Sequence, residues 1–340
     1  MAHSNVLPTS ILAFVSAAIL TAGSAVANPE TWKRQGWSKT DFSKSSVTFS
    51  EILSGGPPKD GIPSIDKPVF QTVAEATELV ATEPVIGLEI NGDARAYPLR
   101  ILTWHEIVND TVGGKPVAVT YCPLCNAAIV FDRRLDGRVF DFGTTGKLRH
   151  SDLVMYDRQT ESWWQQFTGE AIIGELLGKT LALVPARLES FADFKARHPE
   201  GKVLKPNNPQ MRAYGRNPYL RYDSASQPFL FSGDLPKGIL PMTRVVVVRL
   251  KDGPIAVSLP LLVDKKAITI DGIALSWKPG QNSALDTRDI SKGKDVGTVS
   301  VTRRSASGAT ELVAYDVTFA FVFHAFHPER PLHKSASTLN

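Results

Sequence analysis

The sequence predicts an α+β fold that is mainly antiparallel β, with few short helices and two related halves from an internal duplication. The 340 residues include 25 glycines and 23 prolines, which favour many turns. Short apolar segments flank tight turn signals such as Asn91-Gly92, the dipeptide most typical of a two-residue β-hairpin. Three segments of the first half also recur in the same order in the second half. Together these observations predict short strands joined by hairpins and arranged twice along the chain.

The composition is that of a globular protein, and it argues against nucleic-acid binding. Hydrophobic residues make up 43% of the chain and charged residues 21%, which excludes a disordered or fibrous protein. The 38 basic and 34 acidic residues are interspersed and leave a net charge of +4, so no basic surface for nucleic acid is expected. The length allows two domains or one large one.

The first 27 residues have the features of a secretory signal peptide. They contain no charged side chain apart from one histidine, their apolar run covers residues 11–20, and Ala25-Val26-Ala27 is typical of a cleavage site. The usual basic residue before the apolar run is missing. Because the run is short for a bilayer-spanning helix, we expect cleavage after Ala27, a periplasmic or secreted location, and no membrane span in the mature chain.

The elements that follow are predicted from patterning and turn residues. Residues 28–80 are polar and dotted with proline and glycine, so they are expected to form an extension laid over the main body. Periodicity then predicts, in chain order, a hairpin of 85–90 and 94–97, a short helix at 101–108, a strand at 116–121, a second hairpin of 126–132 and 138–142, a strand at 152–156, and a helix at 190–197.

The duplication is predicted by three pairs of similar segments. Their offsets of 156, 160 and 159 residues are nearly equal; the pairs are Val117–Ile129 with Ile273–Leu285, Leu88–Leu99 with Val248–Leu259, and Asp152–Phe167 with Glu311–Phe326. The matches predict a first repeat over 81–190, a linker over 191–240, and a second, degenerate repeat over 241–335.

The only two cysteines, Cys122 and Cys125, form a Cys-x-x-Cys motif in the first half. The aligned positions of the second half are Lys278 and Gln281, so only the first half carries this motif. Three interpretations stay open. The pair could be a disulfide clip, worth only about 2 kcal/mol for so short a loop; a redox-active dithiol, in which both cysteines are catalytic; or part of a copper or zinc site.

Histidines are the candidates to complete such a metal site, because two cysteines alone do not fill it. His105 lies just before the strand that leads to Cys122, and His150 lies in the segment Leu-Arg-His-Ser-Asp. Weaker candidates, which lie in or after the matched segments, are His324, His327 and Met155. The aromatic cluster of Trp163, Trp164 and Phe167 is expected to be core, with a ligand-stacking wall as the alternative.

These motifs resemble the bacterial and archaeal family catalogued as domain of unknown function 3179. The resemblance covers about residues 60–335 and is most specific at Tyr121–Cys125, Leu153–Asp157 and Phe326–Pro328. It includes the segments of His105 and His150, which favours these two histidines, with Cys122 and Cys125, as the metal ligands. The family implies no established activity, so the chemistry has to come from the residues.

The function expected from the sequence is that of an exported protein whose Cys-x-x-Cys site serves thiol redox chemistry or binds copper or zinc. Its partner would be a small molecule, a metal ion or a protein thiol. The alternative is a ligand-binding or structural envelope protein in which a disulfide only clips a turn. Whether the protein is an enzyme stays open, because the sequence shows no nucleophile with a base typical of a hydrolase.

Overall fold

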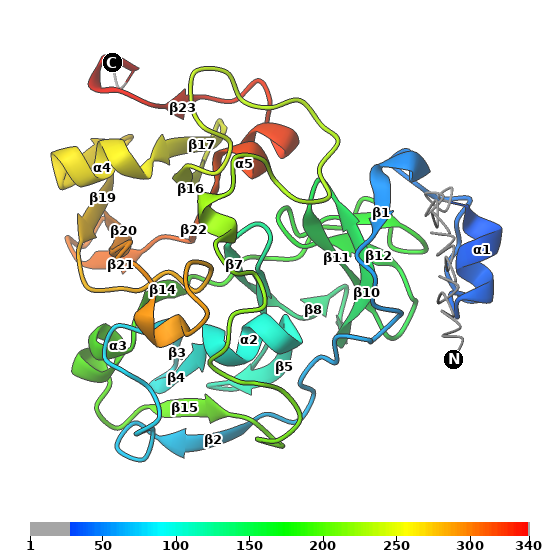
Figure 1. Cartoon of the computed structure of the whole chain (residues 1–340), viewed down its shortest axis with the longest axis horizontal. Helices are drawn as coiled ribbons and strands as arrows, with labels where there is room; N and C mark the ends of the chain where they lie inside the picture. The colour runs from blue at the N-terminus through cyan, green and yellow to red at the C-terminus, as the bar shows by residue number, and fades with distance from the viewer. Residues whose placement is uncertain (1–27, 339–340) are drawn as a thin grey trace, which may run out of the picture.

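The computed structural model describes residues 28–338, so the expected signal peptide lies outside the described residues. Strands account for 39% and helices for 15% of the chain, which confirms a mainly antiparallel β fold with few short helices. Several small sheets form a propeller-like ring (Figure 1). In the described part of the chain, no helix is long and apolar enough to cross a membrane.

Three sheets, here numbered I to III, belong to the first part of the chain. Sheet I has the order β14 (Arg187–Ser190), β3 (Pro84–Ile90), β4 (Asp93–Pro98), β15 (Lys202–Lys205) and β2 (Val69–Thr72). Sheet II consists of β5 (Ile107–Val112), β6 (Lys115–Cys122) and β7 (Ala127–Asp132). Sheet III has the order β1 (Ile52–Ser54), β10 (Phe142–Arg149), β11 (Asp152–Asp157), β12 (Trp163–Gln165) and β13 (Ala171–Ile173).

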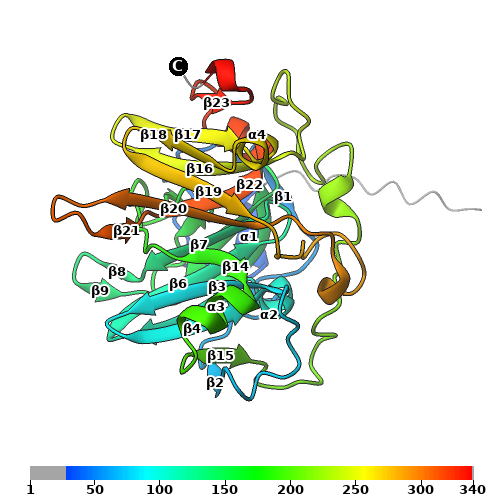
Figure 2. The same ribbon diagram turned by 90° about the vertical axis from the view of Figure 1, so that its left-hand side faces the viewer.

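Two further sheets, IV and V, belong to the second part and lie above sheets I and II in Figure 2. Sheet IV has the order β22 (Tyr315–Phe319), β16 (Arg244–Leu250), β17 (Gly253–Ser258) and β23 (Leu332–His333). Sheet V has the order β18 (Ala267–Ile270), β19 (Ile273–Lys278), β20 (Thr298–Arg304) and β21 (Thr310–Leu312). A small separate hairpin pairs β8 (Arg134–Leu135) with β9 (Arg138–Val139).

The helices are short, and all but the first follow strands directly. They are α1 (Pro29–Arg34), α2 (Leu99–His105), α3 (Phe191–Arg197), α4 (Leu259–Lys265) and α5 (Ala320–Phe326), with 3-10 turns at Phe49–Glu51, Tyr222–Ser224, Ile290–Lys292 and Ala336–Thr338. The side chain of Ser190 caps α3 at Asp193 N, close to the predicted start of this helix. The predicted helix at 101–108 ends earlier, because Glu106 adopts a left-handed φ of 59° and Ile107 opens β5.

The tight turns between strands lie at the turn-forming dipeptides of the sequence. Asn91 and Gly92 both have positive φ, of 50° and 79°, and join β3 to β4 as a tight hairpin. Asp136 and Gly137 do the same between β8 and β9. The predicted pairing of 126–132 with 138–142 is wrong, because β7 pairs with β6 instead. The next long strand, β10, starts at Phe142.

Sheets I and IV share the arrangement of four strands, and sheet I has β2 as an additional edge strand. In each, a central hairpin (β3–β4 or β16–β17) pairs with one antiparallel strand (β14 or β22) and one parallel strand (β15 or β23). A seven-residue helix follows each hairpin, and these helices, α2 and α4, begin 160 residues apart. Sheets II and V each begin directly after this helix.

Two of the three predicted segment pairs therefore lie on corresponding elements, and the third does not. The pair at offset 160 covers the hairpins β3–β4 and β16–β17, and the pair at offset 156 covers β6 and β19. In the third pair, β11 is the middle strand of sheet III, whereas β22 lies in sheet IV and corresponds to β14. The internal duplication as such stays a prediction. The expected linker of 191–240 starts with α3 and β15, and β15 pairs with β4.

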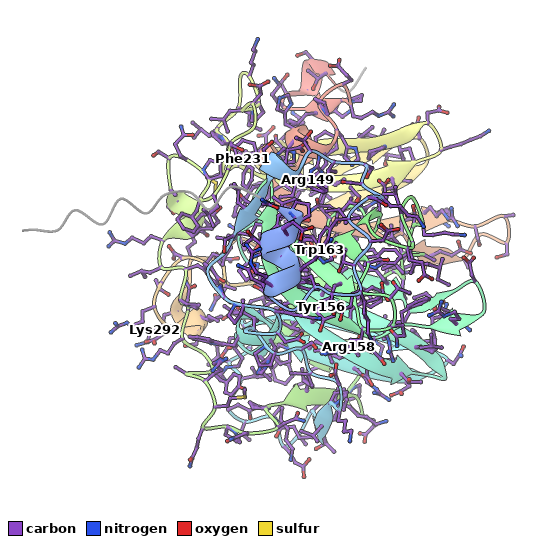
Figure 3. The ribbon with its side chains drawn as sticks, turned by 90° about the vertical axis from the view of Figure 1, so that its right-hand side faces the viewer. Arg149, Tyr156, Arg158, Trp163, Phe231 and Lys292 are labelled. Carbon is purple, nitrogen blue, oxygen red and sulfur yellow. The ribbon has the colours of Figure 1, made fainter. Side chains whose placement is uncertain are left out.

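The extension of residues 28–80 lies on the main body. Its strands β1 and β2 join sheets III and I, and its aromatic residues pack on sheet III. The rings of Trp32 and Trp37 each lie 5.0 Å from that of Trp163, and the ring of Phe42 lies 5.4 Å away. Figure 3 shows Trp163 beside α1, the helix that carries Trp32. Trp163, Trp164 and Phe167 are fully buried, as expected for core side chains.

Candidate metal centre

The Cys-x-x-Cys motif forms the loop between β6 and β7. Cys122, the last residue of β6, pairs with Ala127, the first of β7. The Cys125 amide donates to the Cys122 carbonyl at 3.2 Å, and the Asn126 amide donates to the Pro123 carbonyl at 3.2 Å. Asn126 closes the loop with a φ of 52°, a left-handed conformation that asparagine tolerates. The loop therefore brings the two cysteine side chains together.

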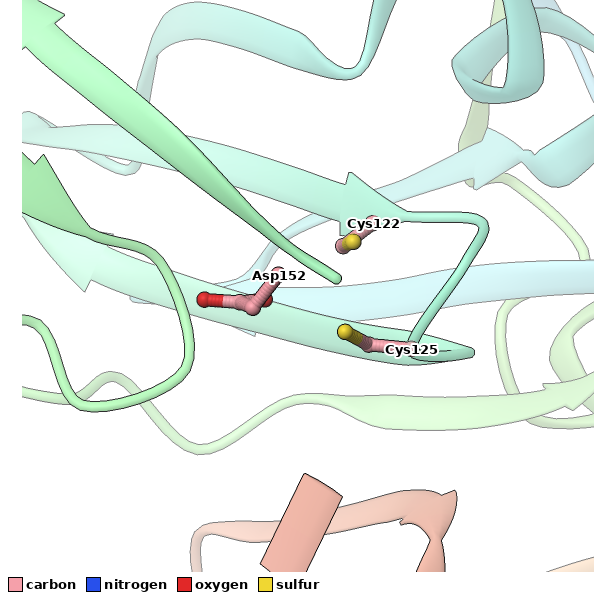
Figure 4. A group of neighbouring side chains, drawn as sticks. All are labelled: Cys122, Cys125 and Asp152. Carbon is pink, nitrogen blue, oxygen red and sulfur yellow. The ribbon is translucent and has the colours of Figure 1, made fainter. Parts of the chain in front are cut away.

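A second hairpin brings a carboxylate to the thiols. The turn between β10 and β11 consists of His150 and Ser151, with φ of 54° and 65°, and Arg149 pairs with Asp152 on either side. Two consecutive left-handed residues are typical of a type I′ turn, which usually takes Asn and Gly. Asp152 opens β11, and its side chain reaches the two cysteines (Figure 4). One carboxylate oxygen and the two Sγ atoms lie within 4.8 Å of one another.

The carboxylate of Asp152 is held on one side only. Its Oδ2 accepts hydrogen bonds from Gln165 Nε2 at 2.6 Å and from the Phe167 amide at 2.9 Å. Its Oδ1 is buried and has no hydrogen-bond partner among the described residues. A buried carboxylate oxygen without a partner is costly in a folded protein. Asp152 is therefore fixed in orientation, with one oxygen free to bind something else.

The centre is buried and rich in acidic groups. Cys122 is 2% exposed, and Cys125 and Asp152 are fully buried. Burial raises the pKa of both thiols and raises the pKa of Asp152 to about 6. Burial and the charge of Asp152 together raise the pKa of Glu106 to about 8. Within residues 28–338, neither Asp152 nor Glu106 forms a salt bridge. No basic side chain of the described residues therefore compensates the negative charge that these carboxylates would carry.

Both cysteines are free thiols in the structure, which therefore does not support the predicted disulfide. The loop that carries them is held by the second half of the chain. Asn126 Nδ2 donates to the Val317 carbonyl at 2.7 Å, and the Thr318 hydroxyl donates to the Cys125 carbonyl at 2.7 Å. Both acceptor and donor lie on β22 of sheet IV. The thiols are thus positioned from both halves.

The predicted histidine ligands lie elsewhere, with partners of their own. His105 makes 2.7 Å hydrogen bonds through Nδ1 to the Pro63 carbonyl and through Nε2 to the Tyr214 hydroxyl. His150 Nε2 lies 3.4 Å from a carboxylate oxygen of Glu51. The structure brings Cys122 and Cys125 together with Asp152, and it brings neither histidine into this group.

Of the three weaker candidates, Met155 is a core residue, and His324 and His327 are half-buried. His327 packs against Phe167 and Phe323, with ring centroids 6.0 Å and 5.6 Å away. Burial lowers its pKa to about 4. Met155 is fully buried in the same hydrophobic cluster as the cysteines. His324 is half-buried on α5.

Sequence reasoning missed Asp152 and Glu106. Asp152 carried one usable signal, because it is a carboxylate that opens the otherwise apolar strand Leu153–Tyr156. Glu106 carried none, since a glutamate between His105 and Ile107 is ordinary at the end of a surface helix. The closeness of Asp152 to the cysteines depends on the packing of sheet III against sheet II, which no local pattern encodes.

The comparisons with known proteins identify the family and no more. No curated protein and no solved structure shows significant similarity to the chain. A family model described as a protein of unknown function (DUF3179) matches residues 59–330. This match covers most of the chain and confirms the resemblance seen in the sequence. The chain belongs to the DUF3179 family of proteins of unknown function.

Proposed function

We propose that this protein binds a zinc ion through the thiolates of Cys122 and Cys125 and the carboxylate of Asp152. The observation that carries the proposal is the group of three ligand atoms within 4.8 Å of one another. One of them belongs to a buried carboxylate whose Oδ1 has no other partner among the described residues. Two hydrogen bonds to the other carboxylate oxygen, Oδ2, hold the side chain in place. The free oxygen is therefore oriented before a metal ion binds.

The charge of the centre supports a cation. Cys122, Cys125, Asp152 and Glu106 are all buried acids, and neither carboxylate forms a salt bridge in the described part of the chain. Without a cation these groups stay protonated or destabilise the fold, because ionising several acids in the interior is costly. A divalent ion removes this conflict, since thiolate and carboxylate are the charged forms that it binds.

The donor set favours zinc over copper. Two thiolates and one carboxylate oxygen suit zinc, which takes sulfur, nitrogen and oxygen ligands in tetrahedral sites. Copper(I) prefers thiolate, thioether and imidazole, and neither His105 nor His150 joins this group. Three protein ligands leave one tetrahedral position for a water molecule or a further ligand. When bound, the ion would supply charge compensation and a Lewis acid inside the fold.

Export forms a second part of the proposal. Residues 1–27 have the composition and the small-residue cleavage motif of a signal peptide, so the mature protein would start at Asn28 and act in the periplasm or outside the cell. Mass spectrometry of the intact protein from a periplasmic extract tests this. A chain that retains Met1 in that extract would contradict it.

The zinc site is tested by the metal content of the whole protein. The protein is purified under reducing conditions, loaded with zinc, freed of excess ion and analysed by mass spectrometry of the metal. Wild type should retain zinc, whereas Cys122→Ser, Cys125→Ser and Asp152→Asn should lose it. Lys278→Ser and Gln281→Ser, at the aligned positions of the second half, are the matched controls and should retain it.

Circular dichroism establishes that each variant is folded before its metal content is compared. Wild-type protein without zinc, or zinc retained when both cysteines are replaced, would overturn the proposal. Preferential retention of copper in a competition between the two ions would reassign the site to copper.

A further inference from the structure

We propose that the same two cysteines form a disulfide when a disulfide oxidant is present, so that oxidation expels the metal. This inference names the regulation of the site and rests on the proposed function. Its first support is that both sulfur ligands come from one loop, Cys122–Cys125. No other cysteine exists in the chain to replace them.

The two cysteines are already close enough in the loop to form a disulfide. The hydrogen bond from the Cys125 amide to the Cys122 carbonyl, at 3.2 Å, closes a turn of four residues. The Cα atoms at the ends of such a turn lie less than about 7 Å apart, and disulfides join Cα atoms about 4.4–6.8 Å apart. The two Sγ atoms lie within 4.8 Å of each other and are not bonded. Rotation of the two side chains therefore suffices to join them.

Oxidation to a disulfide removes the two thiolate ligands of the proposed metal site. A thiolate binds the metal, whereas a disulfide sulfur carries no charge to offer. After oxidation, Asp152 would be the one ligand left of the three, and a single carboxylate does not hold zinc against water. The two states exclude each other because they use the same sulfur atoms.

The exchange balances with a small-molecule disulfide such as oxidised glutathione as the oxidant. One cysteine thiolate attacks a sulfur of the oxidant, breaks its S–S bond and releases one glutathione thiolate. The second cysteine then attacks the mixed disulfide, forms the Cys122–Cys125 bond and releases the other. The two cysteines lose two electrons, the oxidant gains them, zinc leaves as the divalent ion, and each glutathione thiolate takes a proton from water.

The surroundings indicate that Cys122 reacts first. It is the one cysteine of the pair with measurable exposure, at 2%. Its thiol donates to the Ser151 carbonyl at 3.7 Å, and the Ser151 hydroxyl donates to the Phe229 carbonyl at 2.6 Å. Phe229 is 59% exposed and lies in a segment without strands, residues 206–243. The turn residue beside Cys122 is therefore hydrogen-bonded to a segment without strands, and we expect an oxidant to approach Cys122 from this side.

The experiment follows zinc and thiols together in the whole protein. Reduced, zinc-loaded protein is treated with oxidised glutathione in the presence of a chromogenic chelator, and free thiols are titrated in parallel. We expect zinc release in step with the loss of both thiols. Dithiothreitol should reverse the thiol loss and restore zinc binding. In Cys125→Ser, the mixed disulfide on Cys122 should persist as a glutathione adduct seen by mass spectrometry.

The same treatment of metal-free protein separates this inference from the proposed function. Metal-free wild type and Asp152→Asn should both lose two thiols, because the disulfide needs no metal and no carboxylate. If metal-free protein keeps its thiols under excess oxidant, the inference is wrong whatever the zinc result. If the oxidised protein retains zinc, the inference is wrong and the zinc site stands. If the reduced protein binds no zinc, the zinc site fails, while thiol loss still reports on the disulfide.

Discussion

Two loops of this molecule follow corresponding strands, and only one has the chemistry of a site. The loops follow β6 in sheet II and β19 in sheet V, each after a hairpin and a seven-residue helix. The residue after each helix has a left-handed φ, 59° for Glu106 and 63° for Lys266. Each loop also contains a buried asparagine, Asn126 or Asn282, whose side-chain amide donates to a backbone carbonyl. The elements that precede the cysteine loop therefore recur in the second half, but the loop itself covers residues 123–126 and its counterpart covers residues 279–297.

The side chains at aligned positions of the two loops differ in whether they have hydrogen-bond or charge partners. Lys278, aligned with Cys122, forms a salt bridge with Asp193 at the surface. Lys266, aligned with Glu106, lies 4.4 Å above the ring of Trp277. Gln281, aligned with Cys125, accepts a hydrogen bond from Thr298. The aligned groups of the second half pair with other side chains, whereas the first half leaves one buried carboxylate oxygen, Asp152 Oδ1, without a hydrogen-bond partner in the described chain.

The carboxylate of Asp152 lies on a sheet that has no counterpart in the described second half. Sheet III, which carries Asp152, is formed by β10–β13 between β7 and β14, and the second half has no such sheet between β20 and β22 in the described chain. The cysteine loop thus differs from its counterpart by its two cysteines and by the neighbouring sheet III, which supplies Asp152.

The largest effect is expected from moving the cysteines to the other loop. Lys278→Cys with Gln281→Cys, in a chain that also carries Cys122→Ser and Cys125→Ser, places the same motif at the aligned positions of the second half. We expect zinc affinity at least about 100-fold weaker than in wild type, because position 278 is exposed and the carboxylate beside it, Asp193, is solvent-accessible rather than buried as Asp152 is. Isothermal titration with zinc measures this. Equal affinity would show that the loop alone makes the site and that Asp152 is not needed.

The second effect concerns Glu106 and its counterpart. The folded-state pKa of Glu106, about 8, lies above the ordinary value of 4.5. The folded protein therefore binds this proton more tightly than the unfolded chain, and stability falls as pH rises from about 4.5 to about 8. In metal-free protein, Glu106→Gln should remove this loss, a gain of about 5 kcal/mol at most above pH 8 and none below pH 4.5.

Lys266→Gln is the matched control for Glu106→Gln, and its effect should stay within about 1 kcal/mol at every pH, because Lys266 is exposed. Urea unfolding at a series of pH values measures both variants. A pH dependence of stability that is unchanged in Glu106→Gln would show that the carboxyl titrates normally in the folded protein.

The third effect tests how alike the two loops are. Asn126→Ala should cost about 2–3 kcal/mol of unfolding free energy, because it removes the bond to the Val317 carbonyl and puts alanine at a φ of 52°. Asn282→Ala, which loses the bond to the Ser291 carbonyl without a left-handed residue, should cost about 1–2 kcal/mol. Chemical denaturation measures the pair. A larger cost at Asn282 would contradict the proposed equivalence of the two positions.

The smallest effect is expected from replacing His150. This substitution tests whether His150 only forms the β10–β11 turn or also binds zinc. Asparagine adopts a left-handed φ readily, so His150→Asn should keep the β10–β11 turn. It loses the contact with Glu51, worth about 1 kcal/mol or less. We expect unchanged zinc content and a thermal midpoint close to that of wild type. Loss of zinc from a folded variant would return His150 to the ligand set.

The parts of the fold that local sequence determines were predictable, and the contacts between sheets were not. Asn91-Gly92 marked its hairpin because the turn type requires these residues. The Cys122–Cys125 loop was expected at the end of a strand, and β6 does end there. Helix α2 was placed too late, since Glu106 ends it with a left-handed φ that no glycine announced.

The site shows the same division. The cysteines were chosen because their spacing has a chemical meaning that is visible in sequence. The histidines were chosen because the family resemblance includes their segments, yet His150 turns away toward Glu51 while Asp152, two residues on, faces the thiols. Alternation along a strand and the register of a neighbouring sheet decide such choices, and both are set by tertiary packing.

The clamp of the cysteine loop by β22 has a consequence for biogenesis. Asn126 and Val317 are separated by 191 residues along the chain, and Cys125 and Thr318 by 193. Contacts between such distant residues form late and slow the folding of the whole molecule. A ribosome-bound chain that has emerged only as far as sheet III has its thiols and Asp152 but lacks the strand that fixes their loop. The centre is therefore completed only after nearly the whole chain has been synthesised, and an ion captured there would be captured in the compartment where folding ends.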